Sequence, residues 1–353
     1  MSVRVAIVGC GLIGTQWDAD GASQPFSLTH ANGFSKNPRA RLVALCDADS
    51  DKARAAMARW GADAAFSDPR AMFEATPIDL AVVAASSAAR WDVIEPALAA
   101  GVKLLVIEKP LATTLAESRR IVDAIEASGT RSIVNFSRHW DPAMRELRKV
   151  VTAGGLGAIQ RFVGTYGKGV TNNGSHMIDL VSFVCDAAPF AARSLGSPLP
   201  AEEASWSSGK DRALDAQVVF ESSAGHRFQL TMLGTDQNDF TCFELRVIGT
   251  RGMFDMSRGG RKLRYTPAMA DPNYAGYVIP GEPEEVPARA MEAMDMMVAE
   301  ALELAAGGAG AASCDARMAL RTAMTVEAIK QSENAWGRWI DIATLNLDNP
   351  TGE

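Results

Sequence analysis

The stretch VRVAIVGCGLIG at residues 3–14 decides the fold class of this chain. It opens with an apolar run typical of a buried strand, and Gly9, Gly11 and Gly14 follow at the spacing G-x-G-x-x-G. After a strand and before a helix, the first of these glycines permits a tight turn, the second lets the backbone approach a pyrophosphate, and the third lets helix and strand pack closely. The stretch therefore predicts the strand–turn–helix unit of a dinucleotide-binding Rossmann fold.

The same stretch predicts where the phosphates of the cofactor bind. A helix that starts near Leu12 would turn its free N–H groups toward them. We therefore expect contacts to the cofactor from Gly9, Gly11, Leu12, Ile13 and Gly14.

Up to about residue 135 the sequence alternates apolar strands with helical segments rich in Ala, Arg and Glu. This alternation is typical of a doubly wound parallel sheet. The expected strands are 3–8, 41–46, 80–84, 104–107 and 132–135, and the expected helices include 51–60, 70–75, 91–100 and 115–128. We predict a Rossmann domain over residues 1–136.

The rest of the chain, residues 137–353, has a different pattern. Longer strands separated by hairpin-like turns indicate a large, mostly antiparallel sheet in an α+β domain. The expected strands are 159–166, 216–221, 227–232, 242–249 and 252–255, with helices at 142–153, 175–184, 287–305 and 315–332.

An acidic residue closes the second predicted strand, where the dinucleotide fingerprint requires one for the ribose 2′-hydroxyl. Asp47 holds that position, and no arginine directly follows it to accept a 2′-phosphate, so NAD is favoured over NADP. Asp47 lies 33 positions after Gly14, whereas roughly 20 is typical. Residues 16–29 hold the surplus, and they form either a surface loop or a flap over the nicotinamide and substrate.

The motif Glu108-Lys109-Pro110 follows the apolar run at residues 103–107. Pro110 favours an extended conformation for Lys109, at the carboxyl edge of a parallel sheet where ligands bind. A lysine there can hold a substrate hydroxyl or take its proton, because its pKa moves readily on partial burial. The alternative is an ordinary lysine at a strand-to-helix corner.

Composition excludes several classes of function. A net charge of -7, a pI near 5.3 and the absence of a Lys/Arg stripe argue against nucleic acids and anionic membranes as partners. The first strand begins at residue 3 and no apolar stretch approaches the roughly 20 residues of a membrane span, so we expect a cytoplasmic protein. The five cysteines and four histidines follow no ligand spacing, so we expect reduced thiols and no metal site.

Taken together, these motifs and GSHMID at residues 174–179 resemble the Gfo/Idh/MocA oxidoreductase family, over essentially the whole chain. The resemblance implies a Rossmann domain followed by an α+β domain that binds substrate and forms a homodimer or homotetramer through its open sheet. It implies that Lys109 contacts the nicotinamide ribose and the substrate, that His176 exchanges a proton, and that Asp179 orients. Further cofactor contacts are expected from Ser86, Glu108, Lys109 and Asn135.

The second motif supports this reading from its own residues. On a helix that begins near Ser175, His176 and Asp179 share a face, and a histidine in a cleft suits acid–base chemistry near neutral pH. We expect Lys168, Asn172, Asn173 and Asp179 to contact substrate. Family members similar to inositol dehydrogenase carry an aspartate where this chain has Asn172.

These observations predict an NAD-dependent dehydrogenase that acts on a secondary alcohol, or the matching ketone, of a sugar, cyclitol or sugar nucleotide. The alternative is a non-catalytic, NAD-sensing regulatory protein on the same fold. A third possibility is an enzyme that keeps its NAD bound through paired oxidation and reduction.

Overall fold

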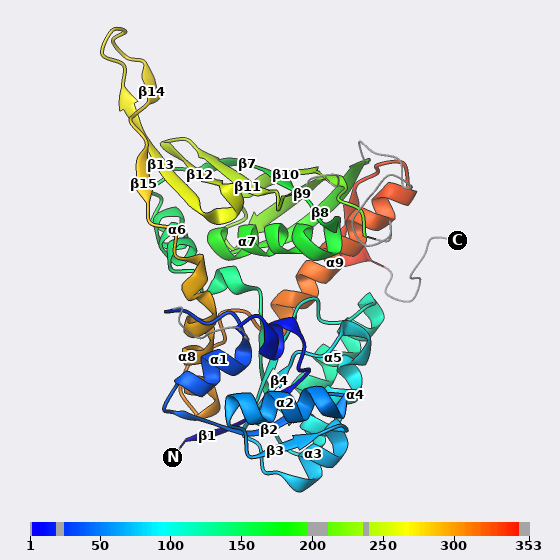
Figure 1. Cartoon of the computed structure of the whole chain (residues 1–353). Coiled ribbons are helices and arrows are strands. Elements are labelled where there is room, and N and C mark those ends of the chain that lie inside the picture. The colour runs from blue at the N-terminus through cyan, green and yellow to red at the C-terminus, as the bar shows by residue number, and fades with distance from the viewer. Residues whose placement is uncertain (1, 19–24, 197–210, 236–239, 346–353) are drawn as a thin grey trace. The chain divides into compact units, whose positions relative to one another are not determined.

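The computed structural model describes residues 2–18, 25–196, 211–235 and 240–345 (Figure 1). It contains two compact units, of which the first comprises Met1–Asp141 with Met291–Leu320 and the second Pro142–Ala290 with Arg321–Glu353. The division of the chain at residue 136 into two functional domains stays a prediction.

A six-stranded parallel sheet forms the centre of the first unit, with the order β3-β2-β1-β4-β5-β6. The order reverses between β1 and β4, and in such sheets ligands bind outside the carboxyl ends of the strands at this switch point. The strands are β1 (Val3–Val8), β2 (Ala40–Cys46), β3 (Ala64–Phe66), β4 (Leu80–Val83), β5 (Leu104–Ile107) and β6 (Arg131–Val134).

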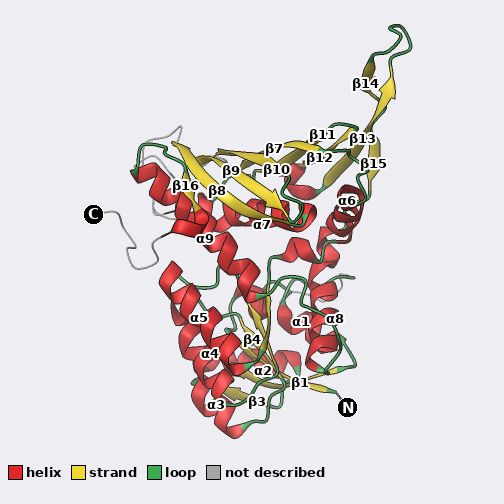
Figure 2. Ribbon diagram, turned by 180° about the vertical axis from the view of Figure 1, so that it is seen from behind, coloured by secondary structure: helices red, strands yellow, loops and turns green. Residues whose placement is uncertain are grey.

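Helices cover this sheet in two layers (Figures 1 and 2). Helix α1 packs against α2 and α8, whereas α3, α4 and α5 pack side by side. Every residue of β4 and β5 is buried, as expected of strands covered on both faces. The helices are α1 (His30–Lys36), α2 (Ser50–Trp60), α3 (Pro69–Ala75), α4 (Arg90–Ala99), α5 (Leu115–Ser128) and α8 (Ala293–Ala305).

The second unit is built on a mixed sheet, ten-stranded within the described residues. Its order is β14-β13-β12-β11-β7-β10-β9-β8-β16, with β15 paired to β13. All of these pairs are antiparallel except β7 with β10. The strands are β7 (Ile159–Tyr166), β8 (Ala187–Gly196), β9 (Asp215–Ser222), β10 (Arg227–Gly234), β11 (Phe243–Gly249), β12 (Gly252–Ser257), β13 (Lys262–Ala270), β14 (Val278–Pro280), β15 (Glu284–Val286) and β16 (Ile340–Asp341).

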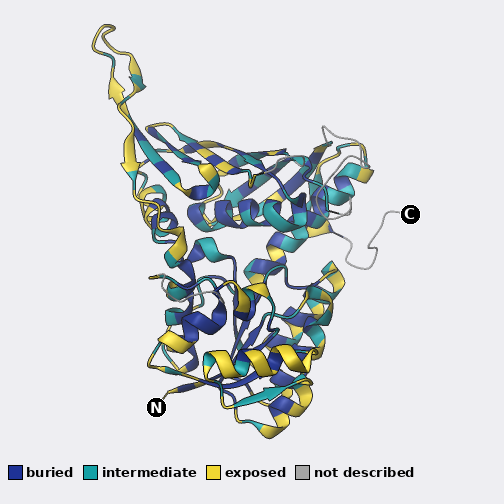
Figure 3. Ribbon diagram, viewed as in Figure 1, coloured by how far each residue is buried: buried dark blue, intermediate teal, exposed yellow. Residues whose placement is uncertain are grey.

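Helices α6 (Pro142–Thr152), α7 (Ser175–Cys185) and α9 (Ala316–Asn334) contribute to the core against one face of this sheet. Burial alternates along the strands, so that Phe228, Leu230 and Met232 of β10 are buried in this core. Val163 of β7 and Leu233 of β10 alternate with buried residues and are exposed, so they lie on the other face of the sheet. Among the described residues, Figure 3 shows no helix over that face. The predicted fold class, a Rossmann domain followed by an α+β domain, is confirmed.

Several elements differ from the expectation. The sequence pattern missed α1 and the strands β3, β8, β13, β14, β15 and β16. The helix expected from Leu12 is one five-residue turn of π-helix, Leu12–Gln16. In the described part of the chain, no helix has both the length and the apolar character needed to cross a membrane.

The surplus segment at residues 16–29 is closed at its base by a buried carboxylate. Asp18 accepts hydrogen bonds from the amide of Leu28 at 2.9 Å and from the amide of Thr29 at 2.7 Å. Residues 19–24 of this segment lie outside the described residues. The two ends of the segment are therefore held together.

Candidate functional site

The glycine turn leaves β1 at the switch point of the first sheet. Gly9 has φ +104°, and a Cβ built on it would lie 2.5 Å from the carbonyl carbon of Ala84 at the end of β4. A Cβ on Gly14 would lie 2.0 Å from the carbonyl oxygen of Gly9. Only glycine therefore fits at either position, because one side chain would collide with the neighbouring strand end and the other with the turn itself.

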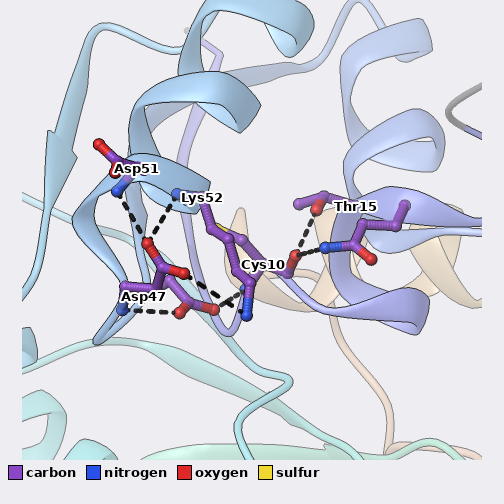
Figure 4. Close-up of polar contacts among 7 residues, drawn as sticks. Cys10, Thr15, Asp47, Asp51 and Lys52 are labelled. Carbon is purple, nitrogen blue, oxygen red and sulfur yellow. Dashed lines mark hydrogen bonds and ion pairs between the residues drawn. The ribbon is translucent and has the colours of Figure 1, made fainter.

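Gly11 differs from both, because a Cβ built on it would meet no atom within 4 Å. The next residue, Leu12, is exposed, and Ile13 is half-buried. Behind the turn, the carbonyl oxygen of Cys10 accepts from Thr15 Oγ1 at 2.9 Å and from Gln16 Nε2 at 2.8 Å (Figure 4). The turn is thus rigid on its inner side and open where the fingerprint requires a phosphate to approach.

Asp47 stands at the end of β2 and is bonded directly to this turn. Its Oδ2 accepts from the amide of Cys10 at 2.8 Å, and its Oδ1 accepts from the amide of Asp49 at 3.0 Å (Figure 4). Asp49 caps α2, and the hydrogen bond from the amide of Lys52 lowers the pKa of its carboxyl. Of the two carboxylates, only Asp47 is held against the glycine turn.

Beyond β4, the chain turns through Ser86, which is exposed, into a short 3₁₀ helix and α4. Trp91 packs under the guanidinium of Arg120, 3.7 Å from its ring centroid. The neighbouring Arg90 is buried, and its Nη2 donates to the carbonyl oxygen of Lys109 at 3.3 Å.

Glu108 and Lys109 follow β5, and the Lys109–Pro110 peptide bond is cis. Glu108 is only 8% exposed, and its Oε1 accepts from Asn135 Nδ2 at 2.7 Å. The same Oε1 lies 2.8 Å from Nε2 of His30, a residue that no sequence motif indicated as functional. The structure thus brings together Glu108 and Asn135, which follow the adjacent strands β5 and β6.

The second group of predicted residues lies in the second unit. Lys168 has φ +66°, a left-handed conformation uncommon for a residue with a side chain, and it precedes the π-helical segment Gly169–Gly174. Helix α7 begins at Ser175 as predicted, with His176 half-buried in its first turn and Asp179 buried.

Two residues that the sequence did not indicate hold the segment before α7. The Asp211 carboxylate accepts from the amides of Thr171 at 2.9 Å and Asn172 at 3.0 Å. Lys330 of α9 donates from Nζ to Thr171 Oγ1 at 2.8 Å. Asn172 and its neighbour Asn173 are therefore presented by an anchored backbone.

The sheet order and the glycine turn are those of a dinucleotide-binding Rossmann fold. Residues 3–136 match the Gfo/Idh/MocA family model, described as an oxidoreductase family with an NAD-binding Rossmann fold. This match confirms the predicted resemblance to the family over the Rossmann part of the chain.

Two curated relatives are each 32% identical to part of the chain. One is D-apiose dehydrogenase of Paraburkholderia graminis, matched over 43% of this chain and 37% of that protein. The other is inositol 2-dehydrogenase 2 of Saccharopolyspora erythraea, matched over 44% of this chain and 43% of that protein. The matches span less than half the length of these relatives.

Solved structures match over 97% of this chain. Levoglucosan dehydrogenase in complex with NADH and levoglucosan has a TM-score of 0.76 at 17% identity, over 97% of this chain and 99% of that chain. An NAD-binding oxidoreductase from Klebsiella pneumoniae has a TM-score of 0.74 at 19% identity, with the same coverage. The second unit therefore has the same fold as in these proteins.

Proposed function

We propose that this protein is an NAD-dependent dehydrogenase that acts on a secondary alcohol, or the matching ketone, of a sugar, cyclitol or sugar nucleotide. The observation that carries the proposal is the carboxyl edge of the first sheet. At this edge, the glycine turn follows β1 and is hydrogen-bonded to Asp47, which follows β2. Glu108 and Lys109 follow β5. The names of the relatives, an apiose dehydrogenase and an inositol dehydrogenase, support the substrate class.

The residues of the turn fit a dinucleotide. The open space at Gly11 leaves room for a pyrophosphate against the backbone of Gly11, Leu12 and Ile13. Asp47 accepts the ribose 2′-hydroxyl in this proposal, and its charge repels a 2′-phosphate, which favours NAD over NADP. Ser86, Lys109 and the side chains around Glu108 and Asn135 complete the contacts at the nicotinamide end.

When bound, NAD accepts a hydride from the substrate carbon at C4 of the nicotinamide. The chain itself must then remove the hydroxyl proton, and Lys109 and His176 are the two groups we propose for it. Either can be the base. Asp179, three residues after His176 on α7, orients it, since the two share a helix face.

Lys168, Asn172, Asn173 and Asp179 are the proposed substrate contacts in the second unit. Asn172 is neutral, so it can hydrogen-bond a hydroxyl but cannot stabilise an imidazolium by charge. Lys330, bonded to the Thr171 hydroxyl, adds a cation to the same segment.

The test is to mix the purified protein with NAD and a panel of D-apiose, myo-inositol, levoglucosan and nucleotide sugars. We expect NADH formation with at least one of them. The double variant Lys109→Ala/His176→Ala should keep NAD binding and lose turnover. A tightly bound dinucleotide with no turnover on any substrate would favour the regulatory alternative, and full activity in the double variant would refute the assignment of the proton-handling pair.

We further propose a cytoplasmic homodimer or homotetramer that associates through the open sheet face. Exposed apolar side chains on that face, Val163 and Leu233 among them, support this. Light scattering after size exclusion should show an oligomer that Leu233→Glu weakens, and a monomeric wild-type protein would refute it.

A further inference from the structure

We propose that His30, Asn135 and Arg90 act with Glu108 as a buried array that positions Lys109. In this role His30 and Arg90 are positioning residues. The inference rests on the proposed function in one respect only, the assignment of Lys109 to proton transfer.

Glu108 is the hub of the array. Its Oε1 lies 2.8 Å from His30 Nε2 and 2.7 Å from Asn135 Nδ2, and His30 is fully buried. The three side chains come from the start of α1, the end of β5 and the end of β6. The residue directly before Lys109 is therefore tied to two other elements of the first unit.

A third contact holds Lys109 itself. Arg90 donates from Nη2 to the carbonyl oxygen of Lys109 at 3.3 Å, and from Nε to the carbonyl oxygen of Ala85 at 3.4 Å. The guanidinium thus bridges the segments that follow β5 and β4. The main chain of Lys109 is fixed on one side by Glu108 and on the other by Arg90.

The charges of the array favour an ionised Glu108. Burial alone would raise the pKa of this carboxyl, but the interactions with His30, the hydrogen bond from Asn135 and the charge of Arg90 bring it below its ordinary value. Burial lowers the pKa of Arg90 to about 10, against the raising effect of Glu108, so Arg90 stays protonated at neutral pH. A buried carboxylate and a buried guanidinium therefore compensate each other behind Lys109.

The ring of His30 makes one hydrogen bond in this array. An ionised carboxylate only accepts hydrogen bonds, so Nε2 of His30 donates to Oε1 of Glu108. The second ring nitrogen, Nδ1, has no hydrogen-bond partner among the described residues. The contact to Glu108 is therefore the hydrogen bond that orients the His30 ring.

Breaking the array should affect proton transfer more than cofactor binding. A displacement of about 1 Å in a reacting group can cost up to about 100-fold in rate. None of the hydrogen bonds of the array involves the glycine turn or Asp47, so the contacts proposed for the pyrophosphate and for the ribose at Asp47 should change little.

The experiment compares His30→Ala with His30→Gln, whose amide nitrogen can replace Nε2 as donor to Glu108. Phe34→Leu is the matched control, because Phe34 is a fully buried residue of the same helix and does not belong to the array. Two properties are measured. One is kcat and KM with the best substrate of the panel, and the other is the rate of reductive methylation of Lys109, followed by mass spectrometry without cofactor.

We expect His30→Ala to lower kcat about tenfold or more with KM changed less than about threefold. In His30→Ala, the methylation rate of Lys109 should change at least about threefold, toward the rate of the exposed Lys149. In His30→Gln, both kcat and the methylation rate of Lys109 should return to the wild-type values. Should His30→Ala not fold, Arg90→Met, which removes the hydrogen bonds to the carbonyl oxygens of Ala85 and Lys109, is measured in its place.

Unchanged Lys109 methylation and kcat in His30→Ala would overturn the proposal, as would equal effects of Phe34→Leu. If wild-type protein turns over no substrate, the proposed function fails, while the methylation rates still decide whether the array positions Lys109.

Discussion

Alanine substitutions of Gly11 and Gly14 should have different effects, because Gly11 is needed to bind the cofactor and Gly14 is needed for the fold. The backbone of Gly11 is extended, with φ -79° and ψ -163°, and no atom lies within 4 Å of a Cβ built there. A methyl group on Gly14 would lie 2.0 Å from the carbonyl oxygen of Gly9. Gly11→Ala should therefore fold normally, and Gly14→Ala should not.

The magnitudes follow from these contacts. Gly11→Ala should change stability by no more than about 0.5 kcal/mol, as for an unhindered surface substitution. Its methyl group enters the space of the pyrophosphate and should weaken NADH binding at least about tenfold, or about 1.4 kcal/mol. In Gly14→Ala the turn must open by about 1 Å, and overpacking of this kind costs about 1–3 kcal/mol or more.

Thermal unfolding with and without NADH measures both effects. Ligand at 100 times its Kd stabilises wild type by about 2.7 kcal/mol, or roughly 4 °C for a chain of this size. Without NADH, the Tm of Gly11→Ala should equal that of wild type. With NADH, the Tm of Gly11→Ala should rise much less than that of wild type. Gly14→Ala should unfold at a lower temperature in both conditions. A wild-type NADH shift in Gly11→Ala would refute the glycine turn as the phosphate site.

Three further predictions concern charge and thiol chemistry. Asp47→Asn should weaken NADH binding about tenfold and improve NADPH binding, measured by calorimetry, whereas Asp51→Asn, a nearby exposed control, should change neither. The hydrogen bonds from Arg4 and the nearby Lys103 lower the pKa of Asp79. The ionised Asp79 therefore stabilises the fold above about pH 4, and this stabilisation is lost as the pH falls further. Asp79→Asn should lower the free energy of unfolding by about 1–2 kcal/mol at pH 7, and a plot of stability against pH should fall less steeply in acid than for wild type. Burial raises the pKa of Cys10, Cys46 and Cys185 to about 12, so iodoacetamide at pH 8 should alkylate them more slowly than Cys242, and equal rates would contradict this.

The sequence predicted those elements whose apolar pattern is strong. Strands β1 and β5 are continuous apolar runs, and their predicted bounds agree with the structure. Strand β8, with the sequence AAPFAARSLG, shows no clear alternation and contains a proline, and it was missed. Helix α1, HANGFSK, was missed because glycine and asparagine are poor helix formers.

Helix α1 is stabilised by contacts that only the folded chain supplies. Thr29 caps it by accepting from the amide of Asn32 at 3.2 Å. Gly33 allows a close approach of α8, since a Cβ built on it would lie 2.9 Å from Cγ2 of Val298. Tertiary packing thus overrides a weak local preference.

The candidate site also contains residues that could be predicted from the sequence and residues that could not. The glycine turn and Asp47 could be predicted because their roles depend on local spacing and on the ends of predicted strands. His30 could not, because it meets Glu108 across 78 positions of sequence and follows the surplus segment that interrupts the fingerprint. Arg90 could not be predicted either, because its guanidinium reaches the backbone of Lys109 across 19 positions of sequence.

Asp211 brings a carboxylate to the segment in which this chain has Asn172 and similar family members have an aspartate. The resemblance places an aspartate at position 172, and this chain has asparagine there. A carboxylate is nevertheless bound to the same segment, because Asp211, 39 positions later, accepts from the amide of Asn172. Gly169 permits the contact, since a Cβ on it would lie 2.2 Å from Asp211 Oδ2. The carboxylate therefore acts on the backbone of this segment, which it anchors through the amides of Thr171 and Asn172.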